Sequence, residues 1–267
     1  MDGKPIGVFD SGIGGLTVVR ALRRALPAEP LVYLGDTARL PYGNKSPETV
    51  RRYSRTNVSF LLGREVKLVL IACNTASALA LPELAGELPV PVLGAVEPGA
   101  RAAARATRSR RIGVIGTLGT VKSEAYVRAI QAIGDFEVVQ HACPLLVPLA
   151  EEGWTDDPLT VAIAERYLTE LCAKQRDLDT LVLGCTHYPI LKPALAQAAA
   201  KVFGRPLTLV DSADAMAAEA AAVLAQRGAL ASGAGGLACF VTDHARITDL
   251  APRFLGEDPG PVAVVDL

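Results

Sequence analysis

The stretch Leu181-Val-Leu-Gly-Cys-Thr-His-Tyr-Pro-Ile-Leu191 decides the fold of this chain. Three apolar residues lead into a glycine and a cysteine, and a proline then marks the start of a helical segment. In an α/β protein this order is typical of a buried parallel strand whose carboxyl end delivers side chains to a crevice. We therefore expect Cys185 at a helix N-terminus, where the helix dipole favours thiolate over thiol.

An internal repeat extends this pattern. The segment Leu68-Val-Leu-Ile-Ala-Cys-Asn-Thr75 ends in the same way, and its Cys73 precedes Cys185 by 112 residues. Earlier in the chain, Ile6-Gly-Val-Phe-Asp-Ser11 is echoed 106 residues later by Ile112-Gly-Val-Ile-Gly-Thr117. Two echoes in the same order predict duplicated α/β halves. Each half would bring one cysteine to a shared cleft, from opposite sides.

Apolar runs alternate with helix-length segments along the chain. Apolar residues three and four apart indicate helices at Leu16–Leu26, Pro47–Leu62 and Pro158–Ala173. Strand–helix alternation predicts an α/β fold with parallel sheets, helices on both faces, and ligands beyond the strand carboxyl ends. The expected strands are Pro5–Phe9, Leu31–Gly35, Lys67–Ala72, Pro91–Leu93, Arg111–Ile115, Phe136–Gln140, Thr180–Leu183, Pro206–Val210, Leu237–Val241 and Val262–Val265.

The composition of the 267 residues is that of an ordinary globular protein, with 50% hydrophobic residues, 21% charged residues and a net charge of −1. This charge gives no electrostatic case for a nucleic acid or a membrane surface as partner. No signal peptide is visible, and no apolar stretch reaches the roughly 18 residues needed to span a bilayer. Five cysteines without a secretion signal favour reduced thiols in a cytoplasm over disulfides. The odd count and the absence of a C-x-x-C pair weaken the redox-motif and zinc-ribbon interpretations.

Two thiols on opposite sides of a substrate can invert a carbon centre by proton transfer. One acts as the base and the other as the acid, and the roles exchange in the reverse direction. Cysteine suits this task when its pKa is tuned toward the working pH. The alternative is that Cys73 and Cys185 are small buried core residues. We interpret Cys143, Cys172 and Cys239 in that way, because they lack the strand-end context.

Asp10 ends the first expected strand, before a glycine-rich turn. Its carboxylate could orient a neighbour in the cleft, or it could cap a helix together with Ser11, and the two roles are compatible. The pair Gly12-x-Gly14 also invites a dinucleotide-binding interpretation. However, Thr17 occupies the third glycine position of G-x-G-x-x-G, so NAD is not expected.

His187 lies two residues after Cys185 and could polarise that thiol. A zinc site built on this pair would need two further ligands, and none stands out, so we expect no metal. The polar loop Asp36–Ser46 is either a surface turn or a substrate-binding loop that closes over the cleft. No P-loop, phosphate cradle or pyridoxal-binding lysine is recognisable. Donors for a substrate carboxylate are available at expected helix starts, namely Asn74, Thr75 and Thr186.

Six segments carry a resemblance to a known family, in family order, over residues 6 to 212. They are Phe9-Asp-Ser-Gly-Ile-Gly-Gly-Leu-Thr17, Gly35-Asp-Thr-Ala-Arg-Leu-Pro-Tyr-Gly43, Ala72-Cys-Asn-Thr-Ala-Ser77, Gly116-Thr-Leu-Gly-Thr120, Pro144–Gly153 and Gly184-Cys-Thr-His-Tyr-Pro189. The sequence resembles the glutamate racemase family, part of the cofactor-independent aspartate/glutamate racemase superfamily. Beyond Gly228 the match fades, so no functional residue is inferred there.

The resemblance implies interconversion of L- and D-glutamate without a cofactor, supplying D-glutamate for peptidoglycan in a bacterial cytoplasm. It implies that Cys73 and Cys185 are the acid/base thiols, with Asp10 assisting the first and His187 with Glu152 assisting the second. The substrate-binding positions that it implies are Asp10, Ser11, Pro41, Tyr42, Gly43, Asn74, Thr75, Thr186 and His187, with Thr117 and Thr120 as further candidates.

The resemblance also implies two α/β domains about a pseudo-twofold axis, with the active site in the cleft between them, and a homodimer. The expected domains are 1–97 plus 208–267, and 98–207. An aspartate racemase is the nearest alternative. By family resemblance, those relatives tend to have a glutamate at the position that His187 occupies here, so the pair Thr186-His187 favours glutamate as the substrate. A protein that only binds an acidic amino acid is a second alternative, although binding a carboxylate does not require two thiols.

Overall fold

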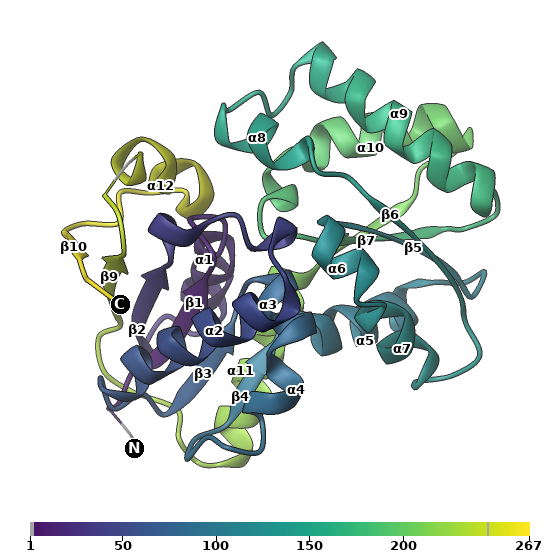
Figure 1. Cartoon of the computed structure of the whole chain (residues 1–267). Helices are drawn as coiled ribbons and strands as arrows, with labels where there is room; N and C mark the ends of the chain where they lie inside the picture. Colours follow the sequence, from purple (N-terminus) through teal and green to yellow (C-terminus); the bar gives the residue numbers. More distant parts are fainter. Residues whose placement is uncertain (1–2, 245) are drawn as a thin grey trace. The chain divides into compact units, whose positions relative to one another are not determined.

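The computed structural model describes residues 3–244 and 246–267, which form two parallel sheets flanked by helices (Figure 1). The chain divides into two compact units. The first unit runs up to Ala95 and resumes with Ala213–Leu267, and the second unit is Val96–Ser212. The predicted fold class, with two parallel-sheet α/β units, is confirmed.

The sheet of the first unit has the strand order β10-β9-β2-β1-β3-β4, and each pairing is parallel. Its central strand β1 is buried along its whole length, as expected of a parallel strand covered on both faces. Helix α1 packs against α12, and α2 packs against α3. The strands are β1 Ile6–Asp10, β2 Pro30–Gly35, β3 Leu68–Ile71, β4 Val92–Gly94, β9 Gly236–Val241 and β10 Val262–Val264. The helices are α1 Leu16–Ala25, α2 Pro47–Leu62, α3 Asn74–Leu79, α4 Leu81–Leu84, α11 Ser212–Gln226 and α12 Ile247–Leu255, with 3-10 turns at Thr37–Arg39 and Tyr42–Asn44.

The sheet of the second unit has the order β6-β5-β7-β8 and is also parallel. Helices α9 and α10 cover one face and α5 and α7 the other (Figure 1). The strands are β5 Arg111–Gly116, β6 Glu137–Ala142, β7 Thr180–Gly184 and β8 Thr208–Asp211. The helices are α5 Val96–Ala106, α6 Leu118–Lys122, α7 Ala125–Gln131, α8 Leu146–Glu151, α9 Pro158–Lys174 and α10 Lys192–Phe203, with a 3-10 turn at Tyr188–Leu191.

The internal repeat is visible in the strand order of the two sheets. The order β2-β1-β3-β4 in the first sheet matches β6-β5-β7-β8 in the second. The repeated segments thus form equivalent strands, β1 with β5 and β3 with β7. The expected division of the chain differs from the observed units mainly at residues 208–212. These residues belong to the second unit because β8 pairs with β7 along Thr180–Leu183.

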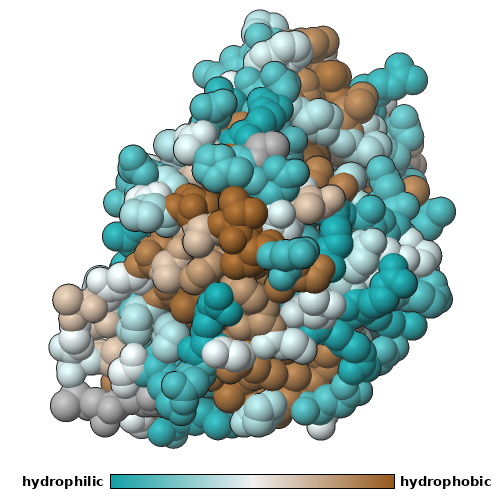
Figure 2. All heavy atoms as spheres, turned by 60° about the vertical axis from the view of Figure 1, so that its left-hand side comes forward, coloured by the Kyte–Doolittle hydropathy of each residue, from teal (hydrophilic) through white to brown (hydrophobic). Residues whose placement is uncertain are grey.

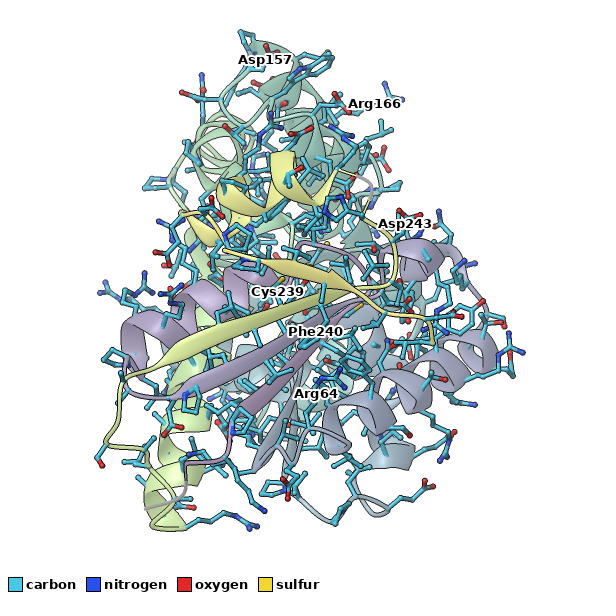
Figure 3. All side chains as sticks on the ribbon, turned by 90° about the vertical axis from the view of Figure 1, so that its left-hand side faces the viewer. Arg64, Asp157, Arg166, Cys239, Phe240 and Asp243 are labelled. Atoms are coloured by element: carbon cyan, nitrogen blue, oxygen red, sulfur yellow. The ribbon has the colours of Figure 1, made fainter. Side chains whose placement is uncertain are left out.

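Two C-terminal strands extend the first sheet beyond the repeated part. Strand β9 pairs with β2, and β10 pairs with β9. Phe240 of β9 meets Phe60 of α2 edge-on, and the Arg64 guanidinium lies 3.4 Å from the Phe60 ring centroid and 4.3 Å from that of Phe240 (Figure 3). The face turned toward the viewer in Figure 2 carries a patch of apolar side chains. Val264, in the edge strand β10, is 56% exposed.

Polar clusters fix the amino ends of β3 and β7, opposite the ends that carry the cysteines. Lys67, just before β3, forms a buried ion pair with Glu29 at 2.7 Å and donates to the Ala229 carbonyl at 2.7 Å. Asp179, just before β7, accepts hydrogen bonds from Thr107 Oγ1 at 2.6 Å and from the Ser109 amide at 2.7 Å. These clusters bind the amino end of each strand to neighbouring loops.

No described helix combines the length and apolarity needed to cross a bilayer.

Candidate functional site

The two candidate cysteines follow the strands at the point where each sheet reverses its direction of growth. In the first sheet β2 and β3 lie on opposite sides of β1, and in the second β6 and β7 lie on opposite sides of β5. In open parallel sheets such a switch point, at the strand carboxyl ends, is where ligands bind. Phe9 pairs with Ile71, and Gly116 pairs with Gly184. The residues that follow these pairs therefore leave each sheet together, at the carboxyl end of its central strands.

Cys73 caps the start of α3, as predicted from its position after a strand. It is 5% exposed, and its Sγ accepts a hydrogen bond from the Ala76 amide at 3.4 Å. The thiol also lies within 3.4 Å of the Ser11 hydroxyl. A negatively charged sulfur accepts an amide hydrogen bond more strongly than a neutral one, so this setting suits a thiolate. Asn74 and Thr75 form the first turn of α3 and are buried.

Asp10 is fully buried at the end of β1. Its Oδ2 accepts a hydrogen bond from the Gly12 amide at 3.1 Å, whereas α1 begins after Gly15 without a side-chain cap. The helix-capping role considered for Asp10 is therefore absent. A Cβ atom at Gly15 would lie 2.4 Å from the Cβ of Asp10, so only glycine lets α1 start here. Tyr33 supports the same turn by donating to the Gly12 carbonyl at 2.8 Å.

The Tyr42 side chain anchors the segment containing Pro41, Tyr42 and Gly43 to the interior of the first unit. Tyr42 is fully buried, donates its hydroxyl to Asp36 and accepts from Asn57 Nδ2 at 3.0 Å. Burial first, and the nearby Asp36 carboxylate second, raise the pKa of Tyr42, so its hydroxyl remains a donor. The side chain is therefore committed to the protein interior. A ligand at this segment would meet its backbone.

Cys185 is 6% exposed and follows β7 directly. The sequence predicts Cys185 at the start of an α-helix, and this prediction is wrong. A turn and the 3-10 segment Tyr188–Leu191 separate it from α10, so the α10 dipole does not begin at this thiol. Its polar neighbour is instead the imidazole of His187, whose Nδ1 lies 3.9 Å from Cys185 Sγ. The Thr186 hydroxyl lies 3.5 Å from the same nitrogen.

The carboxylate that the structure places beside His187 is Glu151. Its Oε1 lies 3.0 Å from His187 Nε2, and the His187 ring is nearly buried. The resemblance had pointed to Glu152, the next residue. Glu152 is the exposed C-cap of α8, and its backbone amide bonds to the Pro148 carbonyl. Because successive helical residues point about 100° apart, neighbouring glutamates cannot share one direction. Adjacent glutamates in a sequence carry no signal of which one turns inward.

Thr117 and Thr120 follow the carboxyl end of β5, which pairs with β7, the strand that Cys185 follows. Thr117 caps α6 by accepting from the Thr120 amide at 3.3 Å, and the two hydroxyls lie 3.1 Å apart. In the first sheet the equivalent place, after β1, holds Ser11. Both sheets thus present a hydroxyl group beside the strand that a candidate cysteine follows.

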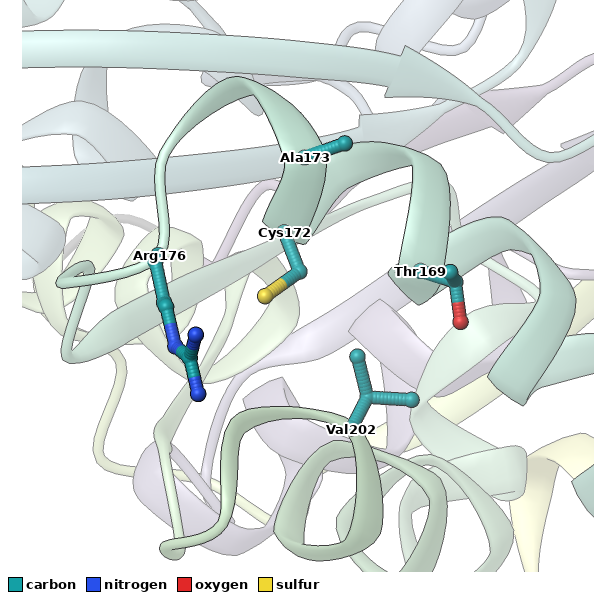
Figure 4. A pocket seen from close by; sticks show the side chains of 5 residues that line it. All are labelled: Thr169, Cys172, Ala173, Arg176 and Val202. Carbon is teal, nitrogen blue, oxygen red and sulfur yellow. The ribbon is translucent and has the colours of Figure 1, made fainter.

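Two of the remaining cysteines, Cys143 and Cys239, are buried as structural residues are, whereas Cys172 is partly exposed. Burial is the main cause that raises the pKa of Cys143, and burial raises the pKa of Cys239 to about 12. Cys172 lines a shallow hollow on α9 and α10 with Thr169, Ala173, Arg176 and Val202 (Figure 4). None of the predicted site residues lines this hollow. Across residues 3–244 and 246–267, no three His, Cys, Asp or Glu side chains are grouped to hold a metal ion.

The sequence matches the family model described as Asp/Glu/hydantoin racemase over residues 6–220. It is 51% identical over 271 residues to the glutamate racemase of Geobacter metallireducens, a match that covers 100% of this chain and 98% of that protein.

Two crystal structures are similar over the full chain. The glutamate racemase of Thermus thermophilus, in complex with beta-chloro-D-alanine, has a TM-score of 0.89 and 47% identity, covering 100% of this chain and 99% of that one. The glutamate racemase of Francisella tularensis, in complex with D-glutamate, has a TM-score of 0.90 and 32% identity, covering 100% and 98%.

Proposed function

The chain belongs to the Asp/Glu/hydantoin racemase family, and from this premise we propose that it interconverts L-glutamate and D-glutamate. The observation that carries the proposal is the full-length identity of 51% to a glutamate racemase, across both units. The Glu151–His187–Cys185 arrangement supports it, because an imidazole beside a thiol suits proton transfer.

The proposed mechanism uses Cys73 and Cys185 as the two acid/base groups and needs no cofactor. One cysteine, as thiolate, removes the proton from the α-carbon and becomes a thiol. The other, as thiol, delivers its proton to the opposite face of the resulting carbanion and becomes a thiolate. Charge and protons balance, and the reverse reaction uses the same groups with exchanged roles. Asp10 assists Cys73 in this scheme, and His187 assists Cys185.

The Glu151 carboxylate fits the role that the resemblance assigned to Glu152. An ionised carboxylate accepts a hydrogen bond from Nε2–H of His187, and this favours the neutral tautomer in which Nδ1 is an acceptor. The acceptor nitrogen is the one that faces Cys185. We propose that Glu151 orients His187 so that the imidazole can exchange a proton with the Cys185 thiol.

The substrate is proposed to be held by short polar groups near the two cysteines. Those groups are Ser11, the backbone of Pro41, Tyr42 and Gly43, Asn74, Thr75 and Thr186. They offer hydroxyl, amide and backbone donors to the substrate carboxylates. The enzyme is proposed to act in the bacterial cytoplasm as a homodimer, and the D-glutamate formed would supply peptidoglycan synthesis.

Incubation with L-glutamate in deuterated water, with no added cofactor, tests this function. Optical rotation reports inversion, and loss of the α-proton NMR signal reports exchange. We expect both with glutamate and neither with L-aspartate. Comparable rates on aspartate would contradict the substrate, and activity that appears only with pyridoxal phosphate would contradict the two-thiol mechanism.

A further inference from the structure

A buried carboxylate, Asp36, gathers three parts of the first unit at the carboxyl end of β2. Its two oxygens accept hydrogen bonds from Arg39 Nε at 2.8 and 2.9 Å. The Tyr42 hydroxyl donates to Oδ2, and the Thr242 hydroxyl donates to Oδ1 at 3.1 Å. Asp36 is completely shielded from solvent, so these bonds replace the water that an ionised carboxylate would otherwise need.

Thr242 connects this network to the end of β9. Its hydroxyl accepts from the Ala38 amide at 2.9 Å while it donates to Asp36. Next to it, the Thr37 hydroxyl donates to the Asp243 carbonyl at 2.6 Å and accepts from the Asp243 amide at 2.8 Å. Figure 3 shows Asp243 just beyond the end of β9. The segment that follows β9 thus holds the first turn of the loop, residues 37–39, in place.

The other end of the same loop is fastened through Tyr42. Asn57 of α2 donates to the Tyr42 hydroxyl at 3.0 Å, and its Oδ1 accepts from Arg39 at 3.2 Å. The Tyr53 ring lies against Tyr42, with centroids 5.7 Å apart, and under the Arg39 guanidinium at 4.6 Å. Leu40 and Pro41 therefore lie between two anchored points.

We propose that Asp36 and Thr242 are positioning residues, which hold the backbone of Pro41, Tyr42 and Gly43 in the conformation that binds the substrate. This inference rests on the proposed function, because that function makes these three residues part of the substrate site. Neither side chain needs to touch the substrate. Asp36 acts through the Tyr42 hydroxyl, and Thr242 acts through Asp36 and the Ala38 amide.

The expected signature is a change in KM with little change in kcat. When an anchor is lost, the loop visits other conformations, and the substrate must first select the competent one. The apparent affinity is then the intrinsic affinity multiplied by the fraction of time that the loop spends in the competent conformation. Once the substrate is bound, the loop is in place and the two thiols react as before. Since the same backbone holds both enantiomers, both KM values should rise together.

Thr242→Val tests the proposal, because valine keeps the shape and removes the hydroxyl. Asp36 retains its ion pair with Arg39, whose Nε donates to both carboxylate oxygens, so the charge stays compensated and the fold should persist. We expect KM for L- and D-glutamate to rise about threefold to tenfold, with kcat within about twofold of wild type. Thr242→Ser, which restores the hydroxyl, should behave like wild type. Thr208→Val, at the exposed start of β8, is the matched control and should change neither constant.

Unchanged KM values in Thr242→Val would overturn the proposal, as would a Thr242→Ser variant no better than the valine variant. So would a fall in kcat that parallels a loss of folded protein in a thermal melt, since that result indicates a purely structural role. Failure of the proposed function itself is distinguishable, because wild-type protein would then fail to invert glutamate in the same assay.

Discussion

The imidazole of His187 bridges Glu151 and Cys185, with Nε2 at 3.0 Å from the carboxylate and Nδ1 at 3.9 Å from the sulfur. The carboxylate contact decides which nitrogen carries the proton in the neutral ring. It leaves Nδ1 as the acceptor toward the thiol. The charge of the Glu151 carboxylate, on α8, therefore influences Cys185 through the His187 ring.

Glu151→Gln should lower kcat about 100-fold, because a neutral amide binds the ring without stabilising its protonated form. Steady-state rates in both directions measure the effect. Glu152→Gln is the matched control one residue away, and its kcat should stay within about twofold of wild type. The reverse ranking of the two variants would return the role to Glu152, as the family resemblance had suggested.

Replacing Cys73 or Cys185 singly by alanine should abolish inversion of both enantiomers, because each direction needs one thiol as base and the other as acid. Proton exchange needs only the base. Any exchange of the α-proton that remains in deuterated water should therefore be confined to one enantiomer, and the two variants should favour opposite ones. NMR of each enantiomer separately measures this. A variant that still inverts glutamate at the wild-type rate would exclude that cysteine from the mechanism.

Asp179→Asn should destabilise the fold at pH 7 by about 1 kcal/mol, a figure that allows for solvent screening at this partly exposed site. Burial alone would raise the pKa of Asp179, but hydrogen bonds from Thr107 and from the Ser109 and Arg108 amides lower it from 3.8 to about 2. A lowered pKa gives stability that is present above pH 3.8 and is lost as the pH falls toward 2.

Urea unfolding at pH 7 and at pH 3 measures this difference. The gap between wild type and Asp179→Asn should narrow at the lower pH. Asp177→Asn serves as the control, because Asp177 is exposed and lies 4.0 Å from Arg111. A gap that stays constant with pH would show that the Asp179 charge contributes nothing.

Lys67→Met should lower the free energy of unfolding by about 3–5 kcal/mol, because it leaves the Glu29 carboxylate buried without its cation. Both side chains of the pair are almost inaccessible, at 3% and 1% exposure. Adding Glu29→Gln should recover part of the loss. Lys4→Met removes an exposed contact with Glu65 at 4.0 Å and should cost less than about 1 kcal/mol. Equal losses in the two lysine variants, measured by urea unfolding, would contradict this account.

The strands could be predicted from the sequence because each is a short apolar run between turn residues. The ten expected strands all appear among the described residues, with shifts of one or two residues at most ends. The repeat was visible because β1 and β5, and β3 and β7, keep similar buried residues and are followed within two residues by Ser11, Thr117, Cys73 and Cys185, respectively. Local pattern was sufficient wherever a segment is buried on both faces.

The details of the site depended on geometry that the sequence does not encode locally. The proline after His187 indicated a helix, but a 3-10 turn intervenes before α10. The partner of His187 depended on the rotation of α8, which set Glu151 rather than Glu152 beside the ring. Thr242 lies 206 residues from Asp36, in the segment where the family resemblance fades. Contacts over such separations leave no periodic signal.

The discontinuity of the first unit has a consequence for the order in which the chain can fold. Val96–Ser212 is one continuous segment, so the second unit has all its strands as soon as Ser212 leaves the ribosome. The first unit begins the chain, yet β9 and β10 are synthesised last and must pair with the waiting edge of β2. The unit that starts earlier is therefore finished later, and until then β2 exposes an unpaired backbone edge.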